Sequence, residues 1–332
     1  MTFRLPRPGR RRFLQISASL ATMGLPAAQA APQDQEDLHH WQGIALGADA
    51  SLTLYHPDRA AADNLIATCL AEVARLEKVF SLYRPDSAIS RLNRDGHLDA
   101  PPLELVELLS LSRQIGDATV GAFDPTVQPL WDLYARHFAA PDANPAGPSR
   151  ESIRAVRERV GLSAIDVGAS EIRFGKPEMA ITLNGIAQGY ITDRIVELLK
   201  ANGMTHALAD MGEVRALGTR PDGTPWSVGL EDAALPGHIA STIPLADRAV
   251  STSGGYGLHF DGAERFNHIF DPHTGETSDS FLAVSVVARS AALADGLSTA
   301  FSVMSLPDMR TTARRFDLQV HVTALDGSRF ML

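Results

Sequence analysis

The sequence predicts an α+β fold in which helices pack on a mixed or antiparallel sheet. From residue 163 onward, short apolar runs typical of strands follow one another with only a few helical segments between them. Between residues 59 and 116, apolar residues instead recur at the spacing of amphipathic helices. Strands in runs argue against a doubly wound parallel sheet. No change of composition divides the chain, so we expect one large domain or two closely associated ones.

Each element follows from a local pattern of apolar residues and turn signals. In the first half we expect a strand or hairpin over 41–55, a helix over 59–80, a polar loop over 81–95, a helix over 103–116, a loop that becomes a helix over 121–138, a surface linker over 141–149 and a short helix over 150–160. In the second half we expect strands over 163–167, 179–184, 205–210, 226–231, 239–245, 248–252, 266–270, 282–288 and 318–324, with helices over 188–202, 291–305 and 307–315.

Charge and cysteine content exclude several classes of function. The 332 residues carry 30 basic and 39 acidic side chains, and residues 1–30 hold five of the arginines and no acid. The remainder therefore has a net charge of −14, which repels polyanions, so we expect no nucleic-acid binding. The single cysteine, Cys69, excludes an internal disulfide and a thiolate metal site.

Residues 1–30 are predicted to be a twin-arginine signal peptide. A basic start is followed by a short apolar run over 13–25 and by the cleavage pattern Ala28-Gln29-Ala30. The sequence Arg-Arg-Arg-Phe-Leu over 10–14 fits the twin-arginine pattern, although a general secretory signal is the alternative. The run is too short for a confident membrane span. We therefore expect a periplasmic chain over 31–332 without an integral membrane span.

Two loops carry candidate ligand-binding groups. Asp124 precedes Pro125, which keeps it in extended backbone, and the alternative is a simple Asp-Pro turn that leads into the next helix. The segment Asn184-Gly-Ile-Ala-Gln-Gly189 joins an expected strand to the start of a helix. Free backbone amides and the helix dipole there favour an anion such as a phosphate. The segment is neither a dinucleotide fingerprint nor a P-loop, and many ordinary turns look similar.

Two further segments could carry catalysis. His268 and Asp271 lie three residues apart at an expected strand end and could move a proton, or Asp271 could cap a turn beside a surface histidine. Asp295 and Thr299 lie one turn apart on a helix and could share a hard cation such as Mg²⁺. The alternative is a helix-stabilising acid and a hydroxyl bonded to its own backbone. The turn over 251–255 offers hydroxyls and amides, or is a plain glycine-rich hairpin.

Taken together and in this order, these segments resemble the ApbE family, the FAD:protein FMN transferases. The resemblance spans about residues 40–325 and rests on eight segments in register. They are Leu46-Gly-Ala, Phe80-Ser-Leu-Tyr83, Ser90-Arg-Leu-Asn93, Gly121-Ala-Phe-Asp-Pro-Thr-Val, Gly185-Ile-Ala-Gln-Gly-Tyr, Ser251-Thr-Ser-Gly, His268-Ile-Phe-Asp-Pro-His-Thr-Gly and Ala294-Asp-Gly-Leu-Ser-Thr. The resemblance implies an ApbE-type α+β fold of two intimately associated subdomains.

The resemblance also implies an activity. The family transfers FMN from FAD to a Ser or Thr hydroxyl of a target flavoprotein and releases AMP, with Mg²⁺ at the pyrophosphate. His268 would be the catalytic histidine, with Asp271 beside it, and Gly185, Asp295 and Thr299 would hold the metal. The flavin nucleotide would contact Leu46, Tyr83, Ala122, Phe123, Asp124, Thr182, Gln188 and Val284. Attack of a weak nucleophile on a pyrophosphate needs both charge neutralisation and a base, which agrees with these roles.

Departures from the family pattern suggest a branch and two alternatives. Thr182 and Gln188 stand where the family has an aspartate and a lysine, and Asp210-Met-Gly-Glu213 replaces a longer glycine-rich stretch, so Asp210 or Glu213 could replace the missing acid. With the twin-arginine signal, these forms resemble the NosX-like branch, whose target would be a membrane-anchored NosR-type flavoprotein. The alternatives are a periplasmic FAD carrier without transferase activity and an FAD pyrophosphatase that yields FMN and AMP.

Overall fold

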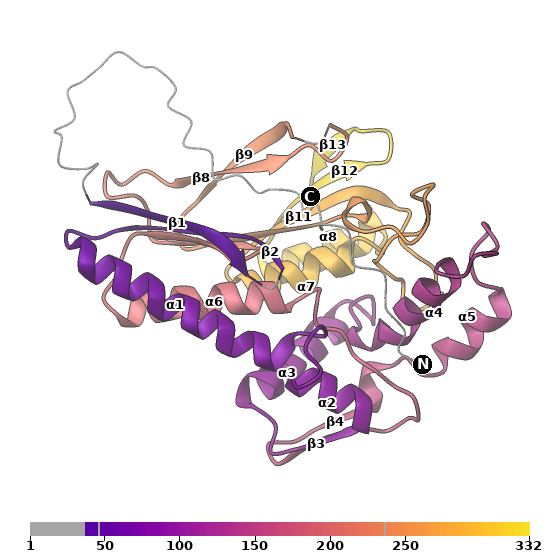
Figure 1. Cartoon of the computed structure of the whole chain (residues 1–332). Helices are drawn as coiled ribbons and strands as arrows, with labels where there is room; N and C mark the ends of the chain where they lie inside the picture. The colour runs from indigo at the N-terminus through magenta and orange to yellow at the C-terminus, as the bar shows by residue number, and fades with distance from the viewer. Residues whose placement is uncertain (1–36, 46, 236) are drawn as a thin grey trace.

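One large antiparallel sheet dominates the computed structural model, which describes residues 37–45, 47–235 and 237–332 (Figure 1). Its strands are β1 (Leu38–Ala45), β2 (Ala48–Tyr55), β6 (Ala207–Asp210), β7 (Val214–Leu217), β10 (Ala249–Ser253), β11 (Phe281–Ala288), β12 (Gln319–Ala324) and β13 (Arg329–Met331). They are hydrogen-bonded in this order, and every neighbouring pair is antiparallel. The predicted α+β class with an antiparallel sheet is therefore confirmed.

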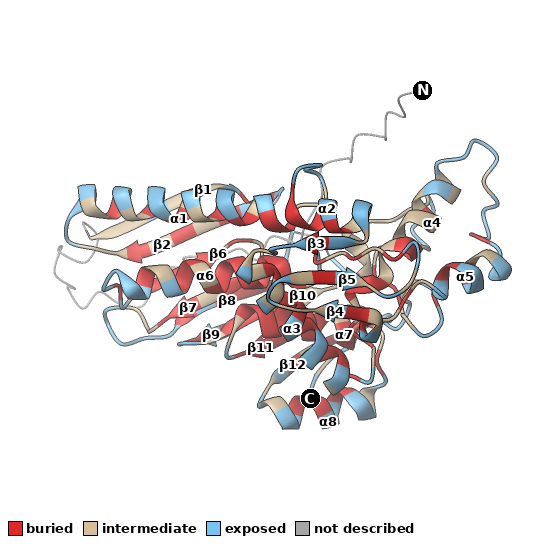
Figure 2. Ribbon diagram, turned by 90° about the horizontal axis from the view of Figure 1, so that it is seen from below, coloured by how far each residue is buried: buried red, intermediate tan, exposed pale blue. Residues whose placement is uncertain are grey.

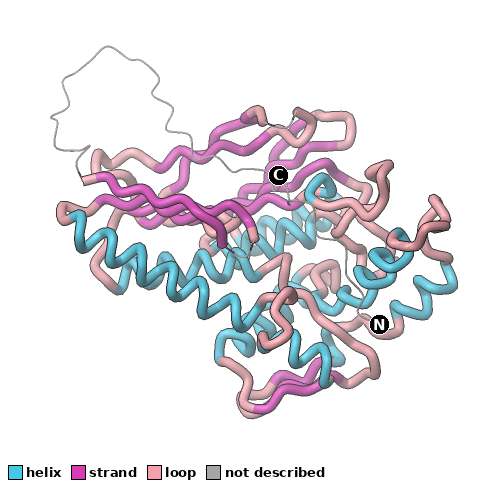
Figure 3. The backbone as a smooth tube through the Cα atoms, viewed as in Figure 1, coloured by secondary structure: helices cyan, strands magenta, loops and turns pink. Residues whose placement is uncertain are grey.

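Helices cover one face of this sheet and a hairpin covers the other (Figures 1 and 3). The helical layer contains α1 (Arg59–Phe80), α6 (Ala187–Ala201), α7 (Ala291–Phe301) and α8 (Leu306–Phe316). The hairpin, β8 (Trp226–Glu231) and β9 (Ile239–Leu245), packs its buried side chains on Val214, Val250 and Val287 of the sheet. Burial on both faces accounts for the continuous apolar runs of the central strands.

A smaller part of the molecule lies below the helical layer in Figure 1. It contains α2 (Ala88–Asp95), α3 (Leu103–Ala118) and the small sheet of β3 (His97–Asp99), β4 (Ile165–Val167) and β5 (Glu171–Phe174). Beside it lie the short 3-10 turns η1 (Pro125–Val127) and η2 (Leu162–Ala164) and the helices α4 (Gln128–Phe138) and α5 (Arg150–Arg157). One apolar core runs through both parts, from Leu52 in the large sheet to Ile172 in the small one.

Helix α7 lies at the centre of this core (Figure 2). Ten of its eleven residues are buried, because it packs on the sheet, on α6 and on α3. A helix that is buried on all sides places any polar group on it in a medium of low dielectric constant. The carboxylate of Asp295 and the hydroxyl of Ser298 are two such groups, and the fold therefore concentrates polar chemistry at this helix.

The structure corrects several sequence predictions. Residues 179–183 are extended but form no strand: the side chain of Asn93 bonds both backbone groups of Ile181, and the Thr182 amide donates to the Pro125 carbonyl at 2.8 Å. Residues 266–270 form isolated bridges instead of the expected strand. Helix α2 occupies much of the expected polar loop over 81–95, with Ser87 as its N-cap. At two of these places, bonds from the side chains of Asn93 and Ser87, rather than apolar periodicity, determine the local backbone.

Val120 ends α3 in a strained conformation, and its replacement by glycine is expected to stabilise the protein. Its φ is 53°, in the left-handed region, while the Gly121 amide closes the helix end on the Gly116 carbonyl at 2.8 Å. A β-branched residue rarely adopts this conformation, and the strain amounts to about 1–2 kcal/mol. The Val120 side chain is 82 % exposed, so little burial is lost. We expect Val120→Gly to raise the free energy of unfolding by about 1 kcal/mol in a urea titration.

Leu103→Gly provides the matched control for this prediction. Leu103 is 67 % exposed at the other end of the same helix, but its backbone is helical. Glycine there should destabilise the protein by up to about 1 kcal/mol because it lowers helix propensity. A fall in stability for Val120→Gly would contradict the assignment of strain to this position.

No helix among the described residues combines the length and apolar character that a bilayer crossing requires. The expected signal over 1–30 lies outside the described residues.

Candidate functional site

A single pocket collects most of the residues that the sequence singled out. It lies where the start of α6, the middle of α7 and the segments over 80–83, 122–131 and 252–272 meet. Ten of the predicted site residues line it, namely Tyr83, Ala122, Phe123, Asp124, Thr182, Gly185, Gln188, His268, Asp295 and Thr299. Segments that are up to about two hundred residues apart in the chain thus converge on one cavity.

The start of α6 is fixed directly against α7. The amide of Gly189 donates to the Asp295 carboxylate at 3.0 Å. A Cβ atom at Gly189 would lie 2.3 Å from the Ala291 carbonyl oxygen, so only glycine allows the two helices to approach this closely. The close approach turns the first free amides of α6 toward a carboxylate that belongs to another helix.

Asp193 holds the beginning of α7 and thereby aligns the rest of that helix. Its carboxylate accepts hydrogen bonds from the amides of Ala291 and Ala292 at 2.7 and 2.9 Å, and from Arg215 at 2.6 Å. Negative charge at a helix N-terminus is stabilising, and Arg215 compensates the charge of this buried acid. With α7 fixed in this way, Asp295 and Thr299 both face the pocket.

The expected metal ligands lie close together. The hydroxyl of Thr299 donates to the Gly185 carbonyl at 3.4 Å, and a Cβ atom at Gly185 would lie 2.9 Å from the same hydroxyl oxygen. Ser253 is 3.3 Å from the Thr299 hydroxyl and 2.7 Å from that of Ser298. A carbonyl, a hydroxyl and a carboxylate thus border the same part of the pocket, and hard divalent cations prefer such oxygen donors.

Buried negative charge dominates this end of the pocket. Burial raises the pKa of Asp295 to about 7, and burial raises the pKa of Asp210 likewise to about 7. The pKa of Glu213 is raised well above its ordinary value, chiefly by burial and then by the nearby Asp295 carboxylate. One Glu213 oxygen, Oε2, is buried without a hydrogen-bond partner among the described residues. Uncompensated carboxylates in such a place favour a bound cation.

The residues present therefore fit a divalent cation, although by a mixed set of donors. In the part of the chain that the structure describes, no group of three or more His, Cys, Asp and Glu side chains forms a metal cluster. A cation here would depend on the Gly185 carbonyl and the Thr299 hydroxyl as well as on carboxylate. Magnesium and calcium accept such ligands, whereas zinc and iron sites typically use His or Cys.

The loop that contains Asp124 forms the apolar wall of the pocket. Asp124 is extended (φ −145°, ψ 109°), as its place before proline predicts. It accepts hydrogen bonds from the amide and hydroxyl of Thr126 at 2.8 and 2.6 Å, and from the Leu162 amide at 3.0 Å. Burial raises the pKa of Asp124, and these bonds oppose that rise. Asp124 therefore fixes the loop that presents the buried side chains of Ala122 and Phe123.

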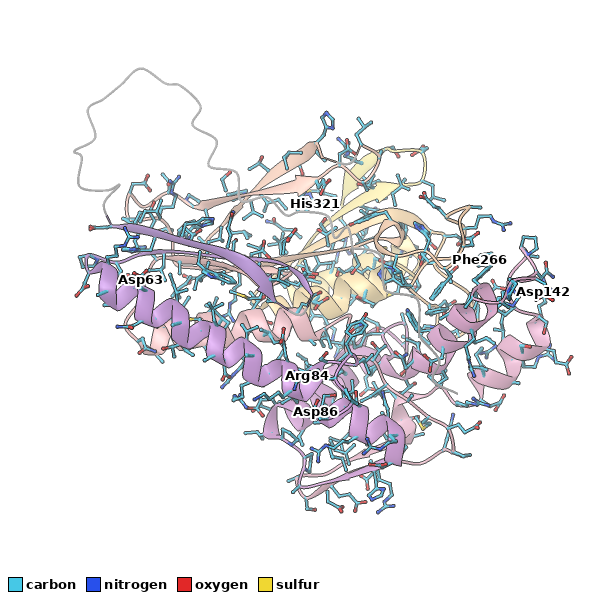
Figure 4. All side chains as sticks on the ribbon, viewed as in Figure 1. Asp63, Arg84, Asp86, Asp142, Phe266 and His321 are labelled. Atoms are coloured by element: carbon cyan, nitrogen blue, oxygen red, sulfur yellow. The ribbon has the colours of Figure 1, made fainter. Side chains whose placement is uncertain are left out.

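Tyr83 is exposed at the rim of the pocket, with a relative accessibility of 62 %. It follows α1 and precedes the ion pair between Arg84 and Asp86, whose nitrogen–oxygen distance is 3.1 Å (Figure 4). An aromatic ring that is exposed at a pocket mouth can stack on a planar ligand such as a flavin or adenine ring.

His268 lies on a segment that an aromatic cluster attaches to α4. The cluster comprises Trp131, Tyr134, Phe138, Phe260, Phe266 and Phe270, with ring centroids 5.1–6.0 Å apart. Figure 4 labels Phe266 at this end of the molecule. His268 Nδ1 is 3.3 Å from the Leu258 carbonyl, which can only accept, so Nδ1 carries the proton and the lone pair of the neutral ring is on Nε2.

Three predicted residues are not among those that line the pocket in the described part of the chain. Asp271 accepts hydrogen bonds from the His273 amide at 2.8 Å and the Thr274 hydroxyl at 3.1 Å, so it caps its own turn. Val284 is fully buried in β11, where it pairs with Ser253. Leu46 lies outside the described residues.

The sequence motifs gave little or no indication that three further residues belong to the pocket. Trp131 and Tyr256 line the pocket, and Glu213 does so from the turn between β6 and β7. Burial, followed by the nearby Glu213 and Glu231 carboxylates, raises the pKa of the Tyr256 phenol. A signal was present for Tyr256, because it directly follows the glycine pair over 254–255. An aromatic residue beside flexible backbone is a common feature of ligand pockets.

Comparison with known proteins decides the family. The sequence model of the ApbE family matches residues 46–323. The chain belongs to the ApbE family. It is 30 % identical to the FAD:protein FMN transferase of Vibrio cholerae over 86 % of each chain, and 32 % identical to that of Treponema pallidum over 72 % of this chain and 71 % of that one. The ApbE family member described here is therefore an enzyme of the flavin transferase class.

A solved structure agrees with the fold as well. The flavin transferase ApbE from Vibrio cholerae superposes with a TM-score of 0.76 at 26 % identity, covering 89 % of this chain and 96 % of that one. The ApbE-type fold predicted from the sequence motifs is thereby confirmed.

Proposed function

We propose that this ApbE family member transfers FMN from FAD to a Ser or Thr hydroxyl of a target flavoprotein and releases AMP. The observation that carries the proposal is the convergence of His268, Asp295 and Thr299 on one pocket that also has an aromatic rim. Asp295 and Thr299 suit a pyrophosphate with its cation, His268 suits proton transfer, and the aromatic rim suits a planar ring system. The FAD:protein FMN transferase names of the relatives support the same activity.

The chemistry that we propose is a substitution at phosphorus. The acceptor hydroxyl oxygen forms a bond to the phosphorus of the FMN half, and the bond from that phosphorus to the oxygen of AMP breaks. The hydroxyl proton passes to Nε2 of His268, whose Nδ1 stays bonded to the Leu258 carbonyl. Tyr83 and the wall of Ala122 and Phe123 hold the ring system, and together they orient the scissile linkage.

A divalent cation is part of the proposal. The Gly185 carbonyl, the Asp295 carboxylate and the Thr299 hydroxyl would hold it, because they supply adjacent oxygen donors. When bound, Mg²⁺ would neutralise charge that develops on the pyrophosphate. The amides at the start of α6 contribute in the same direction, since a helix N-terminus favours phosphate oxygens.

Transfer with release of AMP is the expected result of mixing the protein with FAD, Mg²⁺ and a periplasmic domain that carries a candidate acceptor threonine. The intact mass of the acceptor should rise by one FMN group, free AMP should appear in equal amount, and EDTA should prevent both. AMP without a modified acceptor would instead identify an FAD pyrophosphatase. Bound FAD with neither product, against a second acceptor as well, would identify a carrier, the reading that Thr182 and Gln188 favour.

We further propose that the acceptor is a NosR-type membrane flavoprotein of nitrous oxide reductase maturation, and that the enzyme is periplasmic. The motif forms around Gln188 and Glu213 and the arginines over 10–12 support this. Replacing these arginines by lysine should keep the protein in the cytoplasmic fraction of cells. Periplasmic activity of that variant would exclude the twin-arginine route.

A further inference from the structure

The turn between β6 and β7 brings a carboxylate into the pocket that no role accounts for. Glu213 is only 7 % exposed and lines the cavity. The Ser251 hydroxyl and the Thr252 amide are near enough to lower its pKa, but Oε2 is buried without a hydrogen-bond partner among the described residues. A buried polar atom without a partner costs about 1–3 kcal/mol, and more when it is charged. Such an atom is expected where a ligand completes the site.

The backbone of the turn that carries this carboxylate is fixed against α6. Gly212, which precedes it, has φ +104°, and a Cβ atom there would lie 2.2 Å from the side-chain nitrogen of Gln188. The Thr192 hydroxyl donates to the Glu213 carbonyl at 3.0 Å and to the Gln188 carbonyl at 2.9 Å. The turn is therefore attached to the beginning of α6, and the side chain of Glu213 is built into the pocket wall.

The charges that act on Glu213 indicate which ligand would complete the site. The nearby groups that affect it electrostatically are the carboxylates of Asp295 and Asp210, and both repel it. Gln188, whose side chain lies against Gly212 of the same turn, brings no positive charge. An anionic group of a substrate would add to the repulsion, whereas a cation would remove it.

We propose that Glu213 provides a further oxygen ligand, directly or through one water molecule, to the cation that Gly185, Asp295 and Thr299 would hold. The inference rests on the cation-dependent function proposed above. When both are ionised, the carboxylates of Glu213 and Asp295 carry two negative charges, which balance the charge of one divalent cation. Hard divalent cations take six or more oxygen ligands, so three protein donors leave room for a fourth.

Cation affinity tests the inference without reference to turnover. Mn²⁺ is titrated into the whole protein in the presence of saturating FAD and without acceptor, and binding is followed by calorimetry and by the Mn²⁺ paramagnetic resonance signal. Glu213→Gln should weaken Mn²⁺ binding by roughly 10–100-fold. Glu213→Asp keeps the charge but shortens the side chain, so its Mn²⁺ affinity should lie between that of the unaltered protein and that of Glu213→Gln. Asp295→Asn should weaken binding further than Glu213→Gln does.

Asp210→Asn is the matched control. Asp210 is a half-buried acid at the end of β6, beside the same turn, but its carboxylate accepts a hydrogen bond from the Gly212 amide at 3.0 Å, and it is not among the described residues that line the pocket. Its replacement should leave Mn²⁺ affinity close to that of the unaltered protein. A general effect of charge in the turn would instead weaken binding equally in both variants, which would overturn the assignment of a ligand role to Glu213.

Thermal unfolding separates a ligand role from a structural one. Without metal, Glu213→Gln should melt at the same or a higher temperature, because the amide keeps the size of the side chain and the repulsion by Asp295 is removed. A lower melting temperature together with unchanged Mn²⁺ affinity would make Glu213 structural. Unchanged affinity in Glu213→Gln with loss in Asp295→Asn refutes this inference alone. Failure of the unaltered protein to bind Mn²⁺ refutes the cation site of the proposed function.

Discussion

Asp295→Asn should lower the rate of FMN transfer by roughly 10²–10³-fold. Asparagine keeps the size of the side chain and an oxygen that can accept the Gly189 amide, but it removes the negative charge. The pocket then lacks one of the two carboxylates that would attract a divalent cation. AMP release and the intact mass of the acceptor, followed over time at several Mg²⁺ concentrations, would measure the effect. High Mg²⁺ should restore part of the rate, since affinity is what the variant loses.

Asp193→Asn gives the comparison that this prediction needs. Asp193 is a buried acid on α6, the helix whose start borders the site, but it bonds the α7 amides and Arg215 and is not among the described residues that line the cavity. Its replacement leaves Arg215 without its partner, so it should lower stability, with a rate that high Mg²⁺ does not restore. A full rate in Asp295→Asn at low Mg²⁺ would exclude Asp295 as a cation ligand.

Local patterns predicted those elements whose stability is local. The hairpin over 41–55 and the helix over 59–80 are present as β1, β2 and α1, because their apolar side chains recur with the period of the element that they form. The prediction of a strand over 179–183 was wrong for the opposite reason. Its apolar residues are buried, but its backbone bonds go to the Asn93 side chain and to Pro125, which lie far away in the sequence. Such contacts leave no periodic signal in the chain.

The residues of the candidate site likewise include some that local patterns predicted and some that only the fold reveals. Asp124, His268 and Asp295 were identifiable because each lies in a short segment with an interpretable pattern, and the fold brings all three to one pocket. The pairing of Asp271 with His268 rested on sequence spacing, whereas in the structure Asp271 caps its own turn. The side chain of Glu213 lies beside Ser251 and Thr252 of a neighbouring strand, so its burial and its unpartnered oxygen emerge only in three dimensions.

His268→Ala should lower transfer by roughly 10²–10⁴-fold while FAD binding is retained. The imidazole lines the pocket, and the bond from Nδ1 to the Leu258 carbonyl at 3.3 Å leaves the lone pair of the neutral ring on Nε2. Alanine removes this base but none of the groups that would hold the flavin or the cation. The rate of AMP release with acceptor present, and the FAD dissociation constant from flavin fluorescence, would separate the two effects.

His273→Ala is the control within the same turn. His273 is exposed and packs beside Gly121 rather than lining the pocket, so its loss should leave the transfer rate nearly unchanged. If His268→Ala lost FAD binding in proportion to transfer, the imidazole would be a binding group rather than a base. If the rate of His268→Ala equalled that of His273→Ala, another group would have to accept the hydroxyl proton. The Tyr256 phenol, which also lines the pocket, would be poorly suited to that role, because burial and the Glu213 carboxylate raise its pKa and keep it protonated.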